Sequence, residues 1–85
     1  MTKIEKSLRN LRNNPENARF AELLAVCVHL FGAPHHDGGS HIVFRTGLLD
    51  DPRIVIQSRG KSAKGYQVRQ LLELIDKMER DGNHD

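Results

Sequence analysis

Apolar and polar positions along this 85-residue chain follow two different periods, one helical and one typical of strands. At the start, Ile4, Leu8 and Leu11 recur three or four residues apart between charged residues. That spacing predicts a short amphipathic helix over residues 3–12. Because a residue that precedes proline avoids helical geometry, the helix should end just before Pro15. We expect residues 1–14 to form a helical N-terminal extension.

A stronger stripe follows, in which apolar residues recur at the spacing of a helix that packs one full face against a core: Phe20, Leu23, Leu24, Cys27, Leu30 and Phe31. Asn17 is suited to cap the N-terminus of this helix, because its side-chain oxygen can accept from a free backbone amide. Gly32 is suited to end the helix in a left-handed conformation.

The period then changes from 3.6 to 2, which predicts three short strands at residues 33–36, 41–46 and 53–58. A glycine-rich turn at residues 37–40 joins the first two strands. Alternation directs Ile42 and Phe44 inward in the second strand, and Ile54 and Ile56 inward in the third. The three strands should therefore form an antiparallel meander with one apolar face.

After a basic loop at residues 59–64, a second strong helical stripe begins at Gly65 and should end at Gly82: Tyr66, Val68, Leu71, Leu72, Ile75 and Met78. The order of the elements is helix, three strands, helix, and both helices can cover one face of the sheet. We expect an α+β fold with one domain at residues 15–81 and a frayed tail at residues 82–85.

The composition indicates the cellular compartment of the protein and an uneven distribution of charge along the chain. The single cysteine, Cys27, rules out an internal disulfide and favours the cytoplasm, and its place in the apolar stripe predicts a buried, unreactive thiol. No signal peptide or membrane span is expected. Residues 35–69 carry six Lys or Arg against three Asp, whereas residues 70–85 carry five acids against two bases. A basic middle suits a polyanionic partner.

His41 is the first candidate for chemistry, because alternation places it on the outer face of the second strand beside the turn. An imidazole titrates near neutral pH and can transfer protons, although an ordinary surface histidine also fits this segment. If residues 37–40 close the hairpin, His36 lies opposite His41 and is a candidate second acid or base. One group would then accept the 2′-hydroxyl proton of RNA while the other protonates the leaving 5′-oxygen.

Two further interpretations concern the surroundings of His41. Together with His35 and His36 it could hold a metal, and structural zinc takes four ligands. The only cysteine lies in the core helix and Asp37 is the only carboxylate that could complete the set, so we expect no metal and no cofactor. The basic loop offers Arg59, Lys61 and Lys64 just before a helix, where phosphates commonly bind. Alternation adds Arg45 and Arg53 to the face of His41. A solvated basic loop is the simpler alternative for residues 59–64.

The order of these segments resembles the HicA family of bacterial toxins over roughly residues 17–79. The resemblance lies in the helix that ends in Phe31-Gly32, in Gly39-Ser40-His41 with Ile42-Val43-Phe44-Arg45 after it, in the third strand, in the basic loop and in the helix that starts at Gly65. It implies a fold like that of the double-stranded-RNA-binding domain, with a three-stranded antiparallel sheet and two helices on one face. The chain departs from the family pattern at three places: the extension at residues 1–14, His35-His36 and Gln57-Ser58-Arg59.

The resemblance implies a toxin of a type II toxin–antitoxin system, an mRNA interferase that cleaves RNA without a metal and so blocks translation. It implies that His41 is catalytic, that Lys61, Lys64 and Gly65 contact RNA, and that a HicB-type antitoxin neutralises the enzyme. We expect Arg45 and Arg59 to hold phosphates and Ser40 to shape the turn and hydrogen-bond the substrate. The alternatives are a non-catalytic RNA-binding module of the same fold and a domain that only docks a partner protein.

Overall fold

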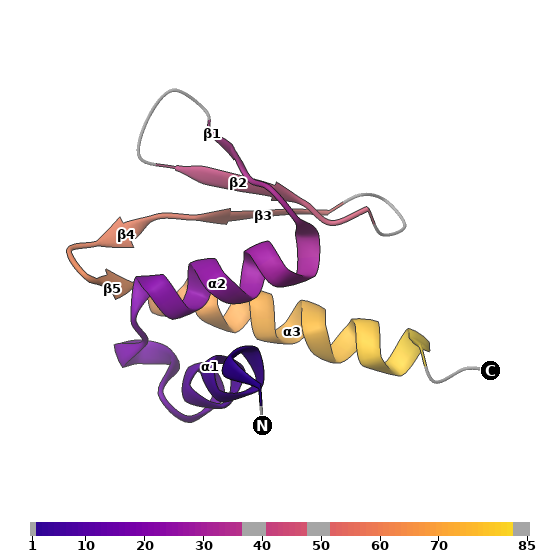
Figure 1. The fold of residues 1–85 in the computed structure, drawn as a ribbon, viewed down its shortest axis with the longest axis horizontal. Coiled ribbons are helices and arrows are strands. Elements are labelled where there is room, and N and C mark those ends of the chain that lie inside the picture. The colour runs from indigo at the N-terminus through magenta and orange to yellow at the C-terminus, as the bar shows by residue number, and fades with distance from the viewer. Residues whose placement is uncertain (1, 37–40, 48–51, 83–85) are drawn as a thin grey trace.

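The computed structural model describes residues 2–36, 41–47 and 52–82. Within these residues the chain forms three α-helices, a short 3₁₀ helix (η1) and two small antiparallel sheets (Figure 1). The predicted α+β class is confirmed. In chain order the elements are α1 (Lys3–Asn13), η1 (Pro15–Asn17), α2 (Phe20–Phe31), β1 (His35–His36), β2 (Ile42–Arg45), β3 (Arg53–Ile56), β4 (Ser58–Arg59), β5 (Ser62–Ala63) and α3 (Gly65–Gly82).

The larger sheet is centred on β2, which pairs with β3 over four residues, from Ile42↔Ile56 to Arg45↔Arg53. The two-residue strand β1 pairs with the other edge of β2. Figure 1 shows this sheet above α2 and α3, with α1 farther from the strands. The residues predicted to face inward do so, since Phe44, Ile54 and Ile56 are buried in the core between the sheet and the helices.

Helix α2 confirms the predicted stripe in part. Gly32 ends the helix at φ 85°, and its N–H donates to the carbonyl of Val28 at 2.9 Å, as expected of a left-handed terminal residue. Two details are wrong. Asn17 belongs to η1 and does not cap α2, which begins one residue after Arg19 without a side-chain cap. Leu30 is 36% exposed, although it follows the buried residues Val26 and Cys27 at helical spacing.

Helix α1 confirms the predicted N-terminal helix and contributes to the core. Leu11 is fully buried within the same apolar cluster as the sheet residues. The side-chain amide of Asn10 donates to the Glu22 carboxylate at 2.8 Å, and Arg12 pairs with Asp76 at 3.0 Å. These contacts fasten α1 to both α2 and α3.

The predicted basic loop before α3 is instead a small hairpin, in which β4 and β5 pair through Ser58↔Ala63 and Arg59↔Ser62. Gly60 supplies the turn with φ 65°. Two backbone bonds fasten the hairpin to the segment before α2. Phe20 N–H donates to the Lys61 carbonyl at 3.0 Å, and Ala63 N–H donates to the Ala18 carbonyl at 2.9 Å. The hairpin is therefore held in place by residues more than forty positions earlier in the chain.

Candidate functional site

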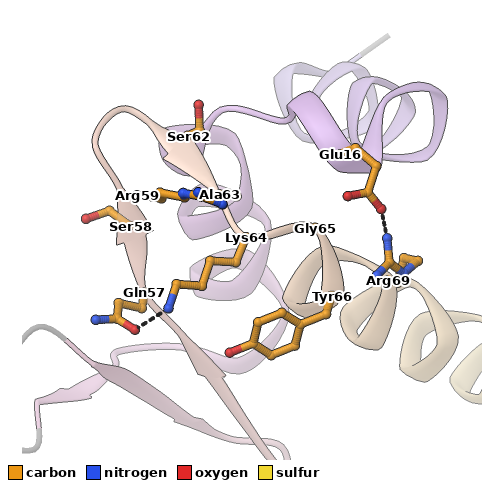
Figure 2. Close-up of a pocket in the computed structure, with 10 residues that line it drawn as sticks. All are labelled: Glu16, Gln57, Ser58, Arg59, Ser62, Ala63, Lys64, Gly65, Tyr66 and Arg69. Carbon is orange, nitrogen blue, oxygen red and sulfur yellow. Dashed lines mark hydrogen bonds and ion pairs between the residues drawn. The ribbon is translucent and has the colours of Figure 1, made fainter.

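A polar groove opens where the β4–β5 hairpin meets the N-terminus of α3 (Figure 2). Its walls come from three segments that are distant in sequence: η1, the stretch from the end of β3 through the hairpin, and the first turns of α3. Its lining residues are Glu16, Gln57, Ser58, Arg59, Ser62, Ala63, Lys64, Gly65, Tyr66 and Arg69. Three of these side chains are cationic and one is anionic, so the lining carries a net charge of +2.

Lys64 lies at the centre of this cationic surface, directly before α3. Its backbone carbonyl accepts from the N–H groups of Gln67 and Val68 at 3.0 and 3.1 Å, so Lys64 occupies the N-cap position. Its ammonium donates to the side-chain oxygen of Gln57 at 2.8 Å, as the dashed line in Figure 2 marks. The backbone of Lys64 therefore begins the helix, and its side chain carries the positive charge from there to the end of β3.

Gln67 connects the sheet to the groove through a buried amide that is only 3% exposed. Its side-chain oxygen accepts from the backbone N–H of Gln57 at 2.9 Å, and its side-chain nitrogen donates to the Tyr66 hydroxyl at 3.3 Å. A buried amide is stable only when its polar atoms have partners, so these bonds fix the end of β3 against the first turn of α3. They also hold two groove residues, Gln57 and Tyr66, in place.

Arg69 forms an ion pair with Glu16 across the groove, between α3 and η1 (Figure 2). The two side chains are 51% and 66% exposed, and exposed pairs typically contribute less than about 1 kcal/mol to stability. A Cβ at Gly65 would meet the Glu16 carboxylate, which is the end of a flexible, exposed side chain and can move aside. Arg69 can therefore exchange this carboxylate for a phosphate at little cost in folding free energy.

His41 is exposed and stands one residue before β2. The last residue pair of the sheet at this end is Ile42↔Ile56, so the antiparallel register brings the backbone of His41 next to that of Gln57. His41 therefore lies at the end of the sheet that leads into the groove, although it is not among the residues that line the groove.

The structure separates several other residues that the sequence groups with His41. The register pairs His36 with Ile42 and His35 with Val43, so the predicted pairing of His36 with His41 is wrong by one residue. Since His36 is paired with Ile42, it is not the cross-strand partner of His41. Arg45 is exposed at the far end of β2, opposite Arg53. Ser40 lies outside the described residues.

The predicted basic loop contributes two of its three cations to the groove. Arg59 and Lys64 line it, whereas Lys61 is exposed at the turn of the hairpin and is not among the lining residues. The prediction that these residues contact RNA stays a prediction for each of them.

Sequence reasoning missed most of the residues that line the groove, including Glu16, Gln57, Tyr66 and Arg69. It assigned Tyr66 to the core stripe of the last helix, but the side chain is 58% exposed. The spacing of the stripe offers a signal against that assignment, because Tyr66 lies about 200° around the helix from Val68. Glu16 and Arg69 are 53 positions apart, and no local pattern connects them.

Cys27 has no part in the groove. It is fully buried in the core, and burial raises the pKa of its thiol to about 12. The neutral thiol is a weak nucleophile, so the prediction of a buried, unreactive cysteine agrees with the structure.

Neither a metal cluster nor a known relative adds to the description of this groove. In the described part of the chain, no three His, Cys, Asp or Glu side chains are grouped closely enough to hold a metal ion. None of the described helices combines the length and the apolar character needed to cross a membrane. No family model, curated protein or solved structure matches this chain. The groove and the residues around it are therefore the features of this protein that indicate a function.

Proposed function

We propose that this chain binds RNA in the groove at the start of α3 and cleaves it with His41 as an acid–base group. The observation that carries the proposal is the gathering of Arg59, Lys64 and Arg69 around a helix N-terminus, at the end of the sheet where His41 precedes β2. The catalytic role of His41 comes from the resemblance to HicA toxins, and the groove supplies the binding surface that such a role needs.

The groove suits phosphates for two electrostatic reasons. Its three cations can replace the counterions of a phosphodiester chain, which is the main source of affinity in many nucleic-acid complexes. The positive end of α3 adds a partial charge and backbone donors at the same place. Ser58 and Ser62 contribute neutral hydroxyl groups on the hairpin wall, which can donate to phosphate or sugar oxygens.

The proposed reaction is transesterification within RNA. His41, acting as a general base, takes the proton of a 2′-hydroxyl group while the 2′-oxygen bonds to the adjacent phosphorus. The bond from phosphorus to the 5′-oxygen breaks, and this oxygen takes a proton from water, which leaves a 2′,3′-cyclic phosphate and a free 5′-hydroxyl. The protonated His41 then returns its proton to water. Lys64 and Arg59 would stabilise the negative charge that grows on the phosphate oxygens in the transition state.

The finer parts of the proposal follow the resemblance. The strand order β1-β2-β3 and the helices α2 and α3 beneath it are compatible with a fold like the double-stranded-RNA-binding domain. We propose a cytoplasmic toxin that cleaves mRNA and so blocks translation, neutralised by a HicB-type antitoxin over the face that carries His41. Sheet faces and edges that stay open in an isolated domain are the surfaces that protein partners usually cover.

Binding and cleavage of a labelled single-stranded RNA by wild-type protein and by His41→Ala test the proposal. We expect cleavage by wild type in the presence of EDTA, with a 2′,3′-cyclic phosphate product. His41→Ala should bind the RNA equally well and cleave it about 10²- to 10⁴-fold more slowly, the usual effect of one acid–base group. RNA with a 2′-deoxy group at the cleaved linkage is the matched control and should stay intact. Equal cleavage by both proteins would contradict the catalytic role of His41.

One observation favours a second candidate, a non-catalytic RNA-binding module. His41 is not among the lining residues of the groove, and the phosphate-binding residues can act without it. In that case wild type and His41→Ala would bind RNA with the same affinity and salt dependence, and neither would cleave it.

A further inference from the structure

Tyr66 is the feature of the groove that phosphate binding leaves unexplained. Among the described phenylalanine and tyrosine side chains it is the only exposed one, at 58%, since Phe44 is buried and Phe20 and Phe31 pack partly buried against the core. Moving an aromatic ring out of water is favourable. An exposed ring that lines a cationic groove is therefore typical of a binding surface.

The ring is also held in place before any ligand arrives. Tyr66 lies in the first turn of α3, and its hydroxyl accepts from the side-chain nitrogen of the buried Gln67 at 3.3 Å. The oxygen of the same Gln67 side chain accepts from Gln57 N–H, which fixes this amide from its other end. A ligand that stacks on a ring so restrained loses little conformational entropy to order it.

Cations lie on both sides of Tyr66 in the sequence and line the same groove. Lys64 donates to Gln57, the residue whose backbone Gln67 binds, so Lys64 and Tyr66 are tied to one hydrogen-bond network. In Figure 2 both side chains extend in the same direction from the start of α3. Arg69 is one helical turn after Tyr66 and therefore on the same side of the helix.

From this arrangement we infer that the groove takes an unpaired RNA nucleotide, whose base stacks on the Tyr66 ring while Lys64 and Arg69 hold the neighbouring phosphates. The inference rests on the proposed RNA-binding function and adds the kind of RNA to it. A base inside a duplex has both faces covered by its neighbours, whereas a base in a single strand or loop offers a free face. Aromatic rings beside a cationic groove are a common way of binding single-stranded nucleic acids.

The test is the affinity of the full chain for a fluorescent single-stranded RNA, measured by anisotropy with His41→Ala in every protein to prevent cleavage. Tyr66→Leu keeps an apolar side chain and removes the ring, and we expect it to weaken binding by roughly 5- to 150-fold. Tyr66→Phe keeps the ring and loses only the bond from Gln67, so it should bind more weakly than the parent protein but more tightly than Tyr66→Leu. Thermal unfolding of each variant checks that the fold is retained.

A second oligonucleotide isolates stacking from charge. RNA of the same length in which the nucleotides are abasic keeps every phosphate, and we expect it to bind the parent protein more weakly by a factor similar to that of Tyr66→Leu. On this RNA, and on a duplex of the same length, Tyr66→Leu should have no further effect. The inference is wrong if Tyr66→Leu binds single-stranded RNA as the parent does, or if it weakens binding of the abasic RNA by the same factor.

A charge variant separates this failure from failure of the proposed function. If Lys64→Ala weakens binding and Tyr66→Leu does not, the groove binds RNA through phosphates alone, and only the stacking inference falls. If the parent protein binds none of these RNAs, the proposed function falls and the inference falls with it.

Discussion

The core and the groove meet at the first turn of α3, but they are built from opposite kinds of residue. The core between the sheet and the helices consists of aliphatic and phenylalanine side chains, with Phe44, Val68 and Leu71 completely buried. The groove consists mainly of exposed or half-buried polar and charged side chains from three segments. Val68 of the core and Tyr66 of the groove are only two residues apart on the same helix.

This difference separates the residues that hold the fold from those that can bind a ligand. A buried side chain contributes to stability through apolar area removed from water, and it is out of reach of a substrate. An exposed cation contributes little to stability and can change partners. Gln67 belongs to both regions, because it is buried like a core residue and bonded to groove residues like a polar one. Substitutions on either side of this boundary should therefore have different effects.

The largest effect is expected from Phe44→Ala, which removes a completely buried ring 6.4 Å from the ring of Phe31. Truncation of a buried phenylalanine usually costs about 3–5 kcal/mol of unfolding free energy. Urea denaturation measures this loss, and Val43→Ala on the other face of β2 is the control, with a smaller cost. The fraction that stays folded should bind RNA as wild type does. A cost below about 1 kcal/mol would contradict the description of the core.

A smaller effect is expected from Gln67→Leu, which preserves the approximate volume of the side chain and removes the acceptor of Gln57 N–H. Loss of one partner from a buried hydrogen bond costs about 1–3 kcal/mol of stability. Because Lys64 and Tyr66 belong to the same network, RNA affinity should fall as well. Gln70→Leu, on an exposed position of α3, is the matched control and should change neither quantity. Loss of stability with unchanged RNA affinity would mean that Gln67 stabilises the fold and does not contribute to RNA binding.

The smallest effect on stability is expected from Glu16→Gln, which removes the anion of the groove and its ion pair with Arg69. Since both side chains are largely exposed, unfolding free energy should change by less than about 1 kcal/mol. RNA affinity should rise by a few fold at low salt and less at high salt, because the carboxylate no longer repels phosphate. Glu79→Gln, an exposed acid near the other end of α3, is the charge-matched control. Equal gains from both variants would indicate a general charge effect.

The sequence predicted the parts of the fold that have a period of their own. Ile4, Leu8 and Leu11 carry the spacing of α1, and Phe44, Ile54 and Ile56 carry the alternation of the larger sheet. The hairpin β4–β5 has no such signal, because two-residue strands are too short to show a period. Bonds from Ala18 and Phe20 hold the hairpin, and no pattern near residues 58–63 points to them.

The residues of the candidate site also fall into those that local sequence features predict and those that only the tertiary fold brings together. The cluster of basic residues before the last helix predicted Arg59 and Lys64 as groove residues, because a run of charges and a helix start are local features. The predicted partner of His41 failed, since the register of a short hairpin depends on the number of residues in its turn, and a shift of one residue changes the pairing. Glu16 entered the groove only through the tertiary fold, by the packing of η1 against α3.

The most direct test of the central claim, that RNA binds at the groove, compares two double variants of equal charge. Arg59→Ala with Lys64→Ala removes two groove cations, whereas Arg45→Ala with Arg53→Ala removes the pair at the far end of β2 and β3. The measurement is the affinity for single-stranded RNA over a series of salt concentrations. We predict that the groove variant binds more weakly at every salt concentration and that its salt slope falls by about 1.4, because each of the two cations neutralises one phosphate of a single strand. The far-end variant should keep the slope of wild type, and an equal or larger loss of affinity in that variant would contradict the claim.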